Sequence, residues 1–241
     1  MLDQLKRDSS GFRLRGLQMT RIEAFTDAAF AFALTLLVVS LDPPSSVDQL
    51  GSALRGVPAF LISAGMLMMF WWGHHEWSRR YGLDDVWTLL LSCGLVFTVL
   101  IYVYPLRFMF QLMMTWIGQL TGLPLGTGVR ISGYQDVNRI FMLYGIGFTI
   151  MSATLVLLNR HAWNLRDVLQ LDTLERHETR AATGAWVILM LSGILSTITA
   201  VVLPPSFVGM PGWAYALLGV AMPLYGKRMN SRRQEILRGA P

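Results

Sequence analysis

Three charged residues stand at the start of an unbroken apolar run, in the segment RIEAFTDAAFAFALTLLVVSL that covers residues 21–41. Arg21 and Glu23 are close enough to its start for their side chains to reach an aqueous surface. Asp27 lies about one and a half helical turns further in, where a carboxylate surrounded by hydrocarbon needs a polar partner or water. The segment is therefore either a helix anchored at a membrane surface or part of a polar site inside a membrane protein.

The same segment has an apolar face when it is drawn as an α-helix. At about 100° per residue, that face holds Ala28, Phe32, Thr35, Leu36 and Val39. Asp27 points about 140° away from Phe32 around the helix. We therefore expect one apolar side, interrupted by a single hydroxyl group, and a second side whose carboxylate is directed at protein.

His74, His75 and Glu76 form the other cluster of residues that could do chemistry. Adjacent histidines on a helix point about 100° apart, so they cannot easily share one metal ion. The sequence shows no second group of ligands at metal-binding spacing, no GxSxG motif and no nucleophile with a spaced base. A structural role is expected for the histidines, with no metal, no cofactor and no enzymatic activity.

The composition indicates the kind of protein that must position these residues. Of 241 residues, 53% are hydrophobic and 15% are charged, whereas soluble domains carry about a quarter charged residues. The charges collect in short clusters between apolar runs of about the 20 residues that cross a bilayer. Six spans are predicted, at residues 22–41, 57–74, 86–104, 140–158, 181–203 and 207–225. The fold class is therefore all-α, a polytopic membrane protein with six transmembrane helices.

Residues 107–120 are apolar but short, and they are interpreted as an extension of the third span or as an interfacial segment. The predicted organisation is a cytoplasmic N-terminal segment (1–20), a transmembrane domain (21–226) and a basic cytoplasmic tail (227–241). Sixteen of the 20 Lys and Arg residues fall on one side of this topology, which places both termini in the cytoplasm. The same placement explains the net charge of +5 without a nucleic-acid partner.

Two motifs resemble those of a known family, the bacterial homologues of the lysosomal potassium channel, which are six-helix chains. RIEAFTD resembles the RxxxFSD signature of the first helix, and FWWGHHEW resembles the W-x-x-H-H pattern of the second. The residues that carry the match are Arg21, Phe25, Thr26, Asp27, Trp71 or Trp72, His74 and His75. Thr26 stands where the family usually has serine and keeps the hydroxyl group.

The resemblance implies a homotetramer with a central pore lined by four copies of the first helix, embedded in the lipid of a cell membrane, expected to be a bacterial inner membrane. It implies a potassium-preferring cation channel in which K⁺ is the permeant ion and rings of apolar side chains constrict the pore. By position, those rings fall at Phe32, Leu36 and Val39, with Thr35 as a selectivity residue. Phe32 departs from the family, which usually has an aliphatic residue there, and four phenyl rings could either plug the pore or turn edgewise.

The resemblance also assigns the motif residues to a structural network, in which the second-helix Trp72, His74 and His75 hold the first helix in place. His74 or His75 is the expected partner of Asp27, and such a pair could respond to pH. The alternative function is a secondary transporter of a small solute or ion, which would need a site near the bilayer midplane, often at broken helices. Few charges or Gly and Pro breaks occur in the middle of the spans, which argues against a transporter.

Overall fold

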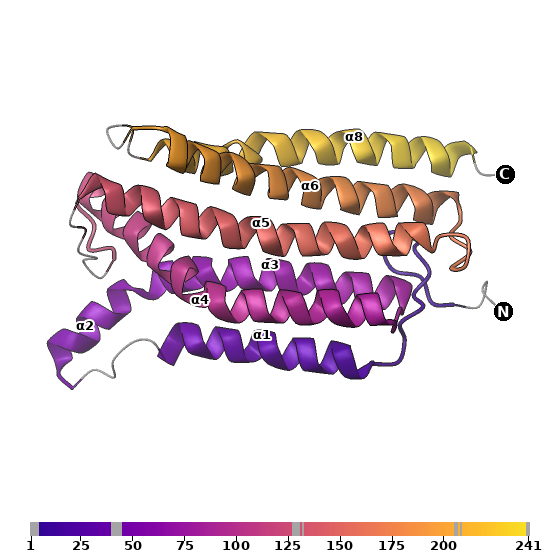
Figure 1. Cartoon of the computed structure of the whole chain (residues 1–241), viewed down its shortest axis with the longest axis horizontal. Helices are drawn as coiled ribbons and strands as arrows, with labels where there is room; N and C mark the ends of the chain where they lie inside the picture. Colours follow the sequence, from indigo (N-terminus) through magenta and orange to yellow (C-terminus); the bar gives the residue numbers. More distant parts are fainter. Residues whose placement is uncertain are drawn as a thin grey trace.

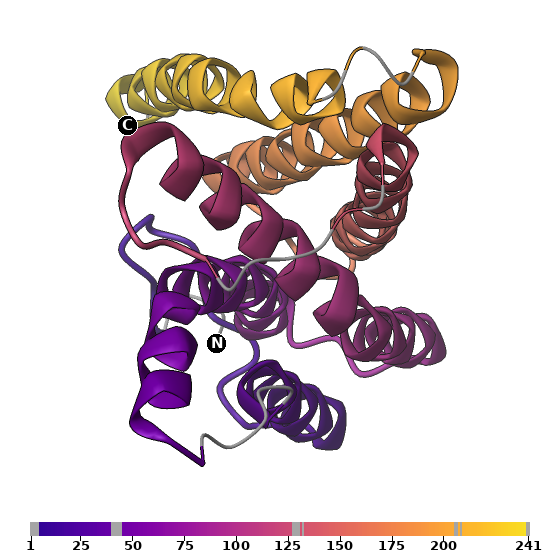
Figure 2. The same ribbon diagram turned by 90° about the vertical axis from the view of Figure 1, so that its left-hand side faces the viewer.

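The computed structural model describes residues 5–39, 45–126, 131, 133–204, 207 and 209–239, and its regular structure over these residues is helical (Figure 1). The helices of this part of the chain are α1 (Arg21–Val39), α2 (Val47–Arg55), α3 (Val57–Tyr81), α4 (Val86–Thr121), α5 (Tyr134–Asn164), α6 (Thr173–Val202), α7 (Met210–Ala216) and α8 (Leu218–Gly239). The long helices lie side by side as a bundle, with α1 at one edge and α8 at the other (Figures 1 and 2).

Four helices in the described residues are long and apolar enough to cross a membrane, which makes the chain a multi-pass membrane protein. They are Val57–Tyr81, Val86–Thr121, Gln135–Asn164 and Thr173–Val202. The other two predicted spans correspond to helices that are not among these four. Residues 22–41 correspond to α1, with residues 40 and 41 outside the described part, and residues 207–225 correspond to α7 and most of the apolar half of α8.

Helix α4 is one continuous helix that changes direction. Asp85 caps its start by accepting a hydrogen bond from the Thr88 N–H, at 2.8 Å, and Pro105 lies inside it. Proline removes an N–H donor and crowds the preceding turn, and it is a common cause of helix bends. The second half of α4 runs across the end of the bundle (Figure 2). Residues 107–120 therefore extend the third span, as one of the two interpretations had it.

The core of the bundle is built around the pairing of α5 with α6. A Cβ atom at Gly145 would collide with the Thr197 hydroxyl of α6, so glycine is needed for this close approach. Aromatic side chains fill the next layer, where Phe70 of α3 meets the rings of Phe148 and Trp186. Among the described helices, α1 packs against α3 and α4, which leaves one of its sides without a helical neighbour in that part of the chain.

Helix α2 is a short amphipathic helix that the sequence analysis did not predict. Ser46 caps it by accepting a hydrogen bond from the Gln49 N–H, and none of its residues is buried. Val47, Leu50 and Leu54 are all exposed on it. Figure 1 shows α2 at the end of the bundle opposite to the N-terminal segment, projecting away from α3.

Residues 5–19, which we call the N-terminal strap, cross one end of the bundle and pack against it before α1 begins. Phe12 is fully buried, and its ring meets that of Tyr81 edge-on at 5.5 Å between centroids. Arg13 and Arg15 both donate to Glu175 of α6, with closest distances of 2.7 and 2.9 Å, and Glu175 has no exposed surface. The strap therefore fastens the segment leading into α1 to a helix that α1 itself does not touch.

The strap also crosses the end of α3 at backbone contact. The Gly16 N–H donates to the Arg79 carbonyl oxygen at 3.0 Å, and a Cβ atom at Gly16 would collide with the Ser78 carbonyl oxygen. Asp8 accepts from the Arg80 guanidinium at 3.1 Å, which adds a charged contact at the same place. Only a glycine fits at this crossing, so the position of the strap is fixed by shape as well as by charge.

Candidate functional site

Helix α1 separates a buried side from an exposed side along its whole described length. Phe30, Ala33 and Leu37 are buried against the bundle, whereas Phe25 and Phe32 are 52% and 57% exposed. Ala28 and Thr35 are exposed on the same side as Phe32. In a membrane protein an apolar face of this kind is available for contact with lipid or with another copy of the chain.

The structure divides the residues that were predicted to form one apolar face. Phe32 and Thr35 are exposed, but Leu36 is partly buried and packs against the core. Leu36 lies about 40° from Phe32 around the helix, toward the side that carries Ala33 and Leu37, and this rotation explains its burial. Val39 lies in α1, but its side chain is outside the described residues.

Thr35 makes one local hydrogen bond. Its Oγ1 donates to the Ala31 carbonyl oxygen at 3.0 Å, which is the usual arrangement for a threonine within a helix. The hydroxyl oxygen keeps its lone pairs as acceptors on the exposed side of α1. Thr35 can therefore offer oxygen to a cation that lies beside this face.

The partner of Asp27 is a tryptophan. Trp71 Nε1 donates to Asp27 Oδ1 at 2.8 Å, and the ring of His75 stacks on the Trp71 ring at 5.3 Å between centroids. His74 points elsewhere and shares a buried hydrogen bond of 2.9 Å with Ser92 of α4. The expected contact of Asp27 with a histidine is thus replaced by one with Trp71, because Trp71 and His75 share the side of α3 that faces α1.

Glu23 is a member of this site that the sequence analysis placed near the water surface. It is only 2% exposed, and its Oε1 lies 3.6 Å from Nδ1 of His75. Thr20 precedes it and caps α1 by accepting from the Glu23 N–H at 3.2 Å. The spacing contained the signal: residues 23 and 27 are four apart on α1, and 71 and 75 are four apart on α3, so two contacts form in register.

The remaining motif residues take different positions within one chain. Thr26 is fully buried, and its hydroxyl has no hydrogen-bond partner among the described residues. Arg21 and Phe25 are exposed, and Trp72 is 59% exposed. Trp72 was predicted as a member of the network, but Trp71 makes the contact with Asp27, because the two neighbours point about 100° apart on α3.

We refer to Glu23, Asp27, Trp71 and His75 as the α1–α3 polar contact. It lies on the side of α1 away from the exposed face, and it joins α1 to α3 near the start of α1. The hydrogen bond from Trp71 lowers the penalty of placing the Asp27 carboxylate in an apolar helix. The site therefore consists of a free apolar face with one hydroxyl group and a polar anchor behind it.

Comparisons with known proteins agree with this architecture. The family model described as endosomal/lysosomal potassium channel TMEM175 matches residues 21–105, which include α1 and α3. A protein of Marivirga tractuosa described as a potassium channel is 29% identical over 231 residues, covering 94% of each chain. The crystal structure of a variant of the potassium channel MtTMEM175, solved with a nanobody–MBP fusion, superimposes with a TM-score of 0.82 at 28% identity, over 94% of this chain and all of that one.

These matches define a helical membrane protein of the channel class, and the resemblance inferred from the motifs is confirmed. The chain resembles the TMEM175 proteins in the family match to residues 21–105 and in a structural match over 94% of its length. The matched family and both relatives are described as channels, so the prediction that the chain is not an enzyme is confirmed as well.

Proposed function

We propose that the chain assembles as a homotetrameric, potassium-preferring cation channel with a central pore lined by four copies of α1. The observation that carries the proposal is the free apolar face of α1, on which Phe32 and Thr35 are exposed while the opposite side of the helix lies in the core. Relatives that match nearly the whole chain are described as potassium channels, which supports the same activity here.

A constriction at Phe32 would act through dewetting. Four phenyl rings at one level leave a narrow apolar passage from which water is expelled, and this forms a barrier to a hydrated ion. Leu36 lies one turn further along, at the border between the free face and the core, and Val39 follows. Thr35 would supply oxygen where an ion has lost part of its hydration shell, and K⁺ loses that shell more easily than Na⁺.

An open groove beside α1 supports the assembly part of the proposal. It lies between α1 and α3 and is lined by Leu34, Thr35, Val38, Phe60, Ala64 and Met68. A neighbouring copy packed on the Phe60, Ala64 and Met68 side of this groove would cover apolar surface that one chain leaves exposed, while Thr35 stays toward the pore. In a cell membrane, with both termini in the cytoplasm, the start of α1 and the strap would then form the inner mouth of the pore.

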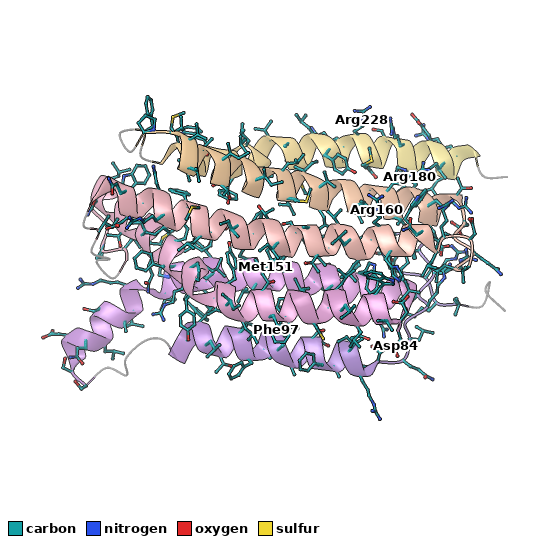
Figure 3. All side chains as sticks on the ribbon, in the orientation of Figure 1. Asp84, Phe97, Met151, Arg160, Arg180 and Arg228 are labelled. Atoms are coloured by element: carbon teal, nitrogen blue, oxygen red, sulfur yellow. The ribbon has the colours of Figure 1, made fainter. Side chains whose placement is uncertain are left out.

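The test is potassium flux into liposomes that contain the purified protein, measured beside sodium flux and protein-free liposomes. Phe32→Ala and Leu36→Ala should each raise the flux severalfold and lower the preference for potassium, because they widen the apolar constriction. Phe97→Ala is the matched control, since Phe97 is an exposed phenylalanine of α4 (Figure 3). Unchanged flux and selectivity in both α1 variants would remove α1 from the pore.

A second variant separates the hydroxyl from the constriction. Thr35→Val preserves the shape of the side chain and removes its oxygen, so the potassium-to-sodium ratio should fall a fewfold while assembly is unaffected. A ratio equal to that of the wild type would show that ions do not contact Thr35.

A further inference from the structure

The basic residues at the strap end of the bundle fall into two groups. Those of the first group are paired with carboxylates, as Arg13 and Arg15 are with Glu175. Those of the second group are exposed and have no carboxylate within salt-bridge distance in the described part of the chain. The second group includes Arg160 on α5, Arg180 on α6, and Lys227, Arg228 and Arg232 on α8. Unpaired cations gathered on one side of a membrane protein indicate an anionic partner.

These cations share one level along the bundle. Arg160 follows the apolar run of α5, Arg180 precedes that of α6, and Arg228 follows that of α8. The Tyr225 hydroxyl donates to the Ala181 carbonyl oxygen at 3.0 Å, so the α6 and α8 boundaries lie beside each other. Figure 3 shows Arg160, Arg180 and Arg228 on α5, α6 and α8, which follow one another across the bundle. This level is where the hydrocarbon ends and lipid headgroups begin.

A tryptophan holds one of these arginines in place. The Arg180 guanidinium carbon lies 4.4 Å from the centroid of the Trp163 ring. Arg160 and Trp163 are three residues apart on α5 and share a face of that helix. Tryptophan favours the boundary between hydrocarbon and water, and a guanidinium stacked on its ring keeps its N–H groups for an oxyanion. The cluster therefore combines an aromatic ring, which suits the glycerol level of a lipid, with two guanidinium groups, which suit the lipid phosphate.

We propose that Arg160, Arg180 and Trp163 form a binding site for the headgroup of an anionic phospholipid, with the cations of α8 extending it. A phosphodiester accepts two parallel hydrogen bonds from a guanidinium, whereas a zwitterionic headgroup brings a competing ammonium charge. The site faces lipid on the side of the chain opposite to α1 and does not depend on ion conduction.

The test measures lipid binding by the purified full-length protein. Native mass spectrometry, with thermal unfolding in detergent as a second readout, is carried out with phosphatidylglycerol, phosphatidylcholine and inorganic phosphate. The wild type should bind phosphatidylglycerol in preference to phosphatidylcholine, and the double variant Arg160→Gln, Arg180→Gln should weaken that binding about tenfold. Arg139→Gln is the matched control, because Arg139 is an exposed arginine near the opposite end of the same helix.

Three results would overturn the proposal: equal phosphatidylglycerol affinity in the double variant and the wild type, an equal loss in Arg139→Gln, or equal binding of the two lipids. Stabilisation by inorganic phosphate alone would assign the site to a soluble anion instead. If the double variant does not fold, the lipid affinity of Arg180→Lys is compared with that of the wild type instead. Lysine retains the charge but loses the two parallel N–H donors and the stacking on Trp163. Lipid binding does not require potassium flux. A protein that binds phosphatidylglycerol but conducts no potassium would therefore contradict the channel proposal and leave the lipid site intact.

Discussion

Asp27 and Glu23 show how α1 is held at the level of single residues. Each carboxylate meets a side chain of α3, Trp71 in the first case and His75 in the second, and the two contacts are one helical turn apart. The pairing fixes both the height and the rotation of α1 relative to α3. Rotation matters because it decides which side chains of α1 remain exposed.

Trp71→Phe should weaken this anchor. It removes the indole donor to Asp27 and leaves a partly buried carboxylate with an unmet hydrogen bond, which costs about 1–3 kcal/mol. Thermal unfolding in detergent measures the loss. Trp72→Phe is the control at the exposed neighbour, and an equal loss in both variants would contradict the role of the Asp27 contact.

The sequence predicted that Asp27 needs a partner, because its depth in an apolar helix can be read directly. It could not decide which partner, since Trp71, His74 and His75 all lie within about one turn of α3. The choice depends on how α3 is rotated, and that rotation is set by packing across the bundle, including the His74–Ser92 hydrogen bond with α4. Hydropathy along the chain carries no information on this rotation.

At the level of elements, the salt bridges of Arg13 and Arg15 with Glu175 determine where the strap lies. Glu175→Gln should loosen it, because both arginines would lose the charge of their buried carboxylate and Asp172, 3.5 Å from Arg13, would be a more exposed substitute, at a cost of about 3 kcal/mol. The expected result is faster tryptic cleavage after Arg13 and Arg15. Glu178→Gln is the control on the same helix, since Glu178 pairs with Arg233 of α8, and equal cleavage rates would contradict this role of Glu175.

Asp8 makes the strap sensitive to acid. Partial burial would raise the pKa of Asp8, but hydrogen bonds from Ser10 and the Phe12 N–H, together with the Arg80 charge, hold it below its ordinary value. A pKa that is lowered on folding contributes stability above the unfolded-state pKa of about 4. That stability is lost as the pH falls through the lower folded-state pKa.

Asp8→Asn should therefore lower the thermal unfolding temperature at pH 7, and the difference from the wild type should shrink as the pH approaches 3. Ser9→Ala is a control beside it, because the hydrogen bonds to Asp8 come from Ser10 and Phe12 instead. A difference between Asp8→Asn and the wild type that is constant from pH 7 to pH 3 would argue against an ionised Asp8 in the strap.

Element boundaries differ in how well sequence predicts them. The apolar runs located the cores of α3 to α6, but α5 and α6 continue as helix through charged residues to Asn164 and from Thr173. A capping box at Asp172 and Glu175 starts α6, which is a local signal that hydropathy does not register. Ser46 and Gln49 give a similar signal for α2. The strap has a local signal only for the turn from Asp8 to Phe12, because the partners that dock it lie far along the chain.

At the level of the whole molecule, the strap and the end of α8 lie at one end of the bundle, and α2 lies at the other (Figure 1). The excess of Lys and Arg at the strap end predicts that this end is cytoplasmic. Labelling of intact cells with an impermeant maleimide tests this in a Cys93→Ser background. Asp48→Cys in α2 should be labelled and Ser231→Cys in α8 should not, and the reverse pattern would invert the topology.

The connection between Arg13 and Glu175 joins residues 162 positions apart, so it imposes an order on biosynthesis. The ribosome releases the strap and α1 early, whereas Glu175 emerges only after α5 has been completed. Until then, the two arginines lack the Glu175 carboxylate, and the segment leading into α1 is not attached to α6. A nascent chain that stops short of α6 contains α1 and its contacts with α3, but its strap has no Glu175 to bind.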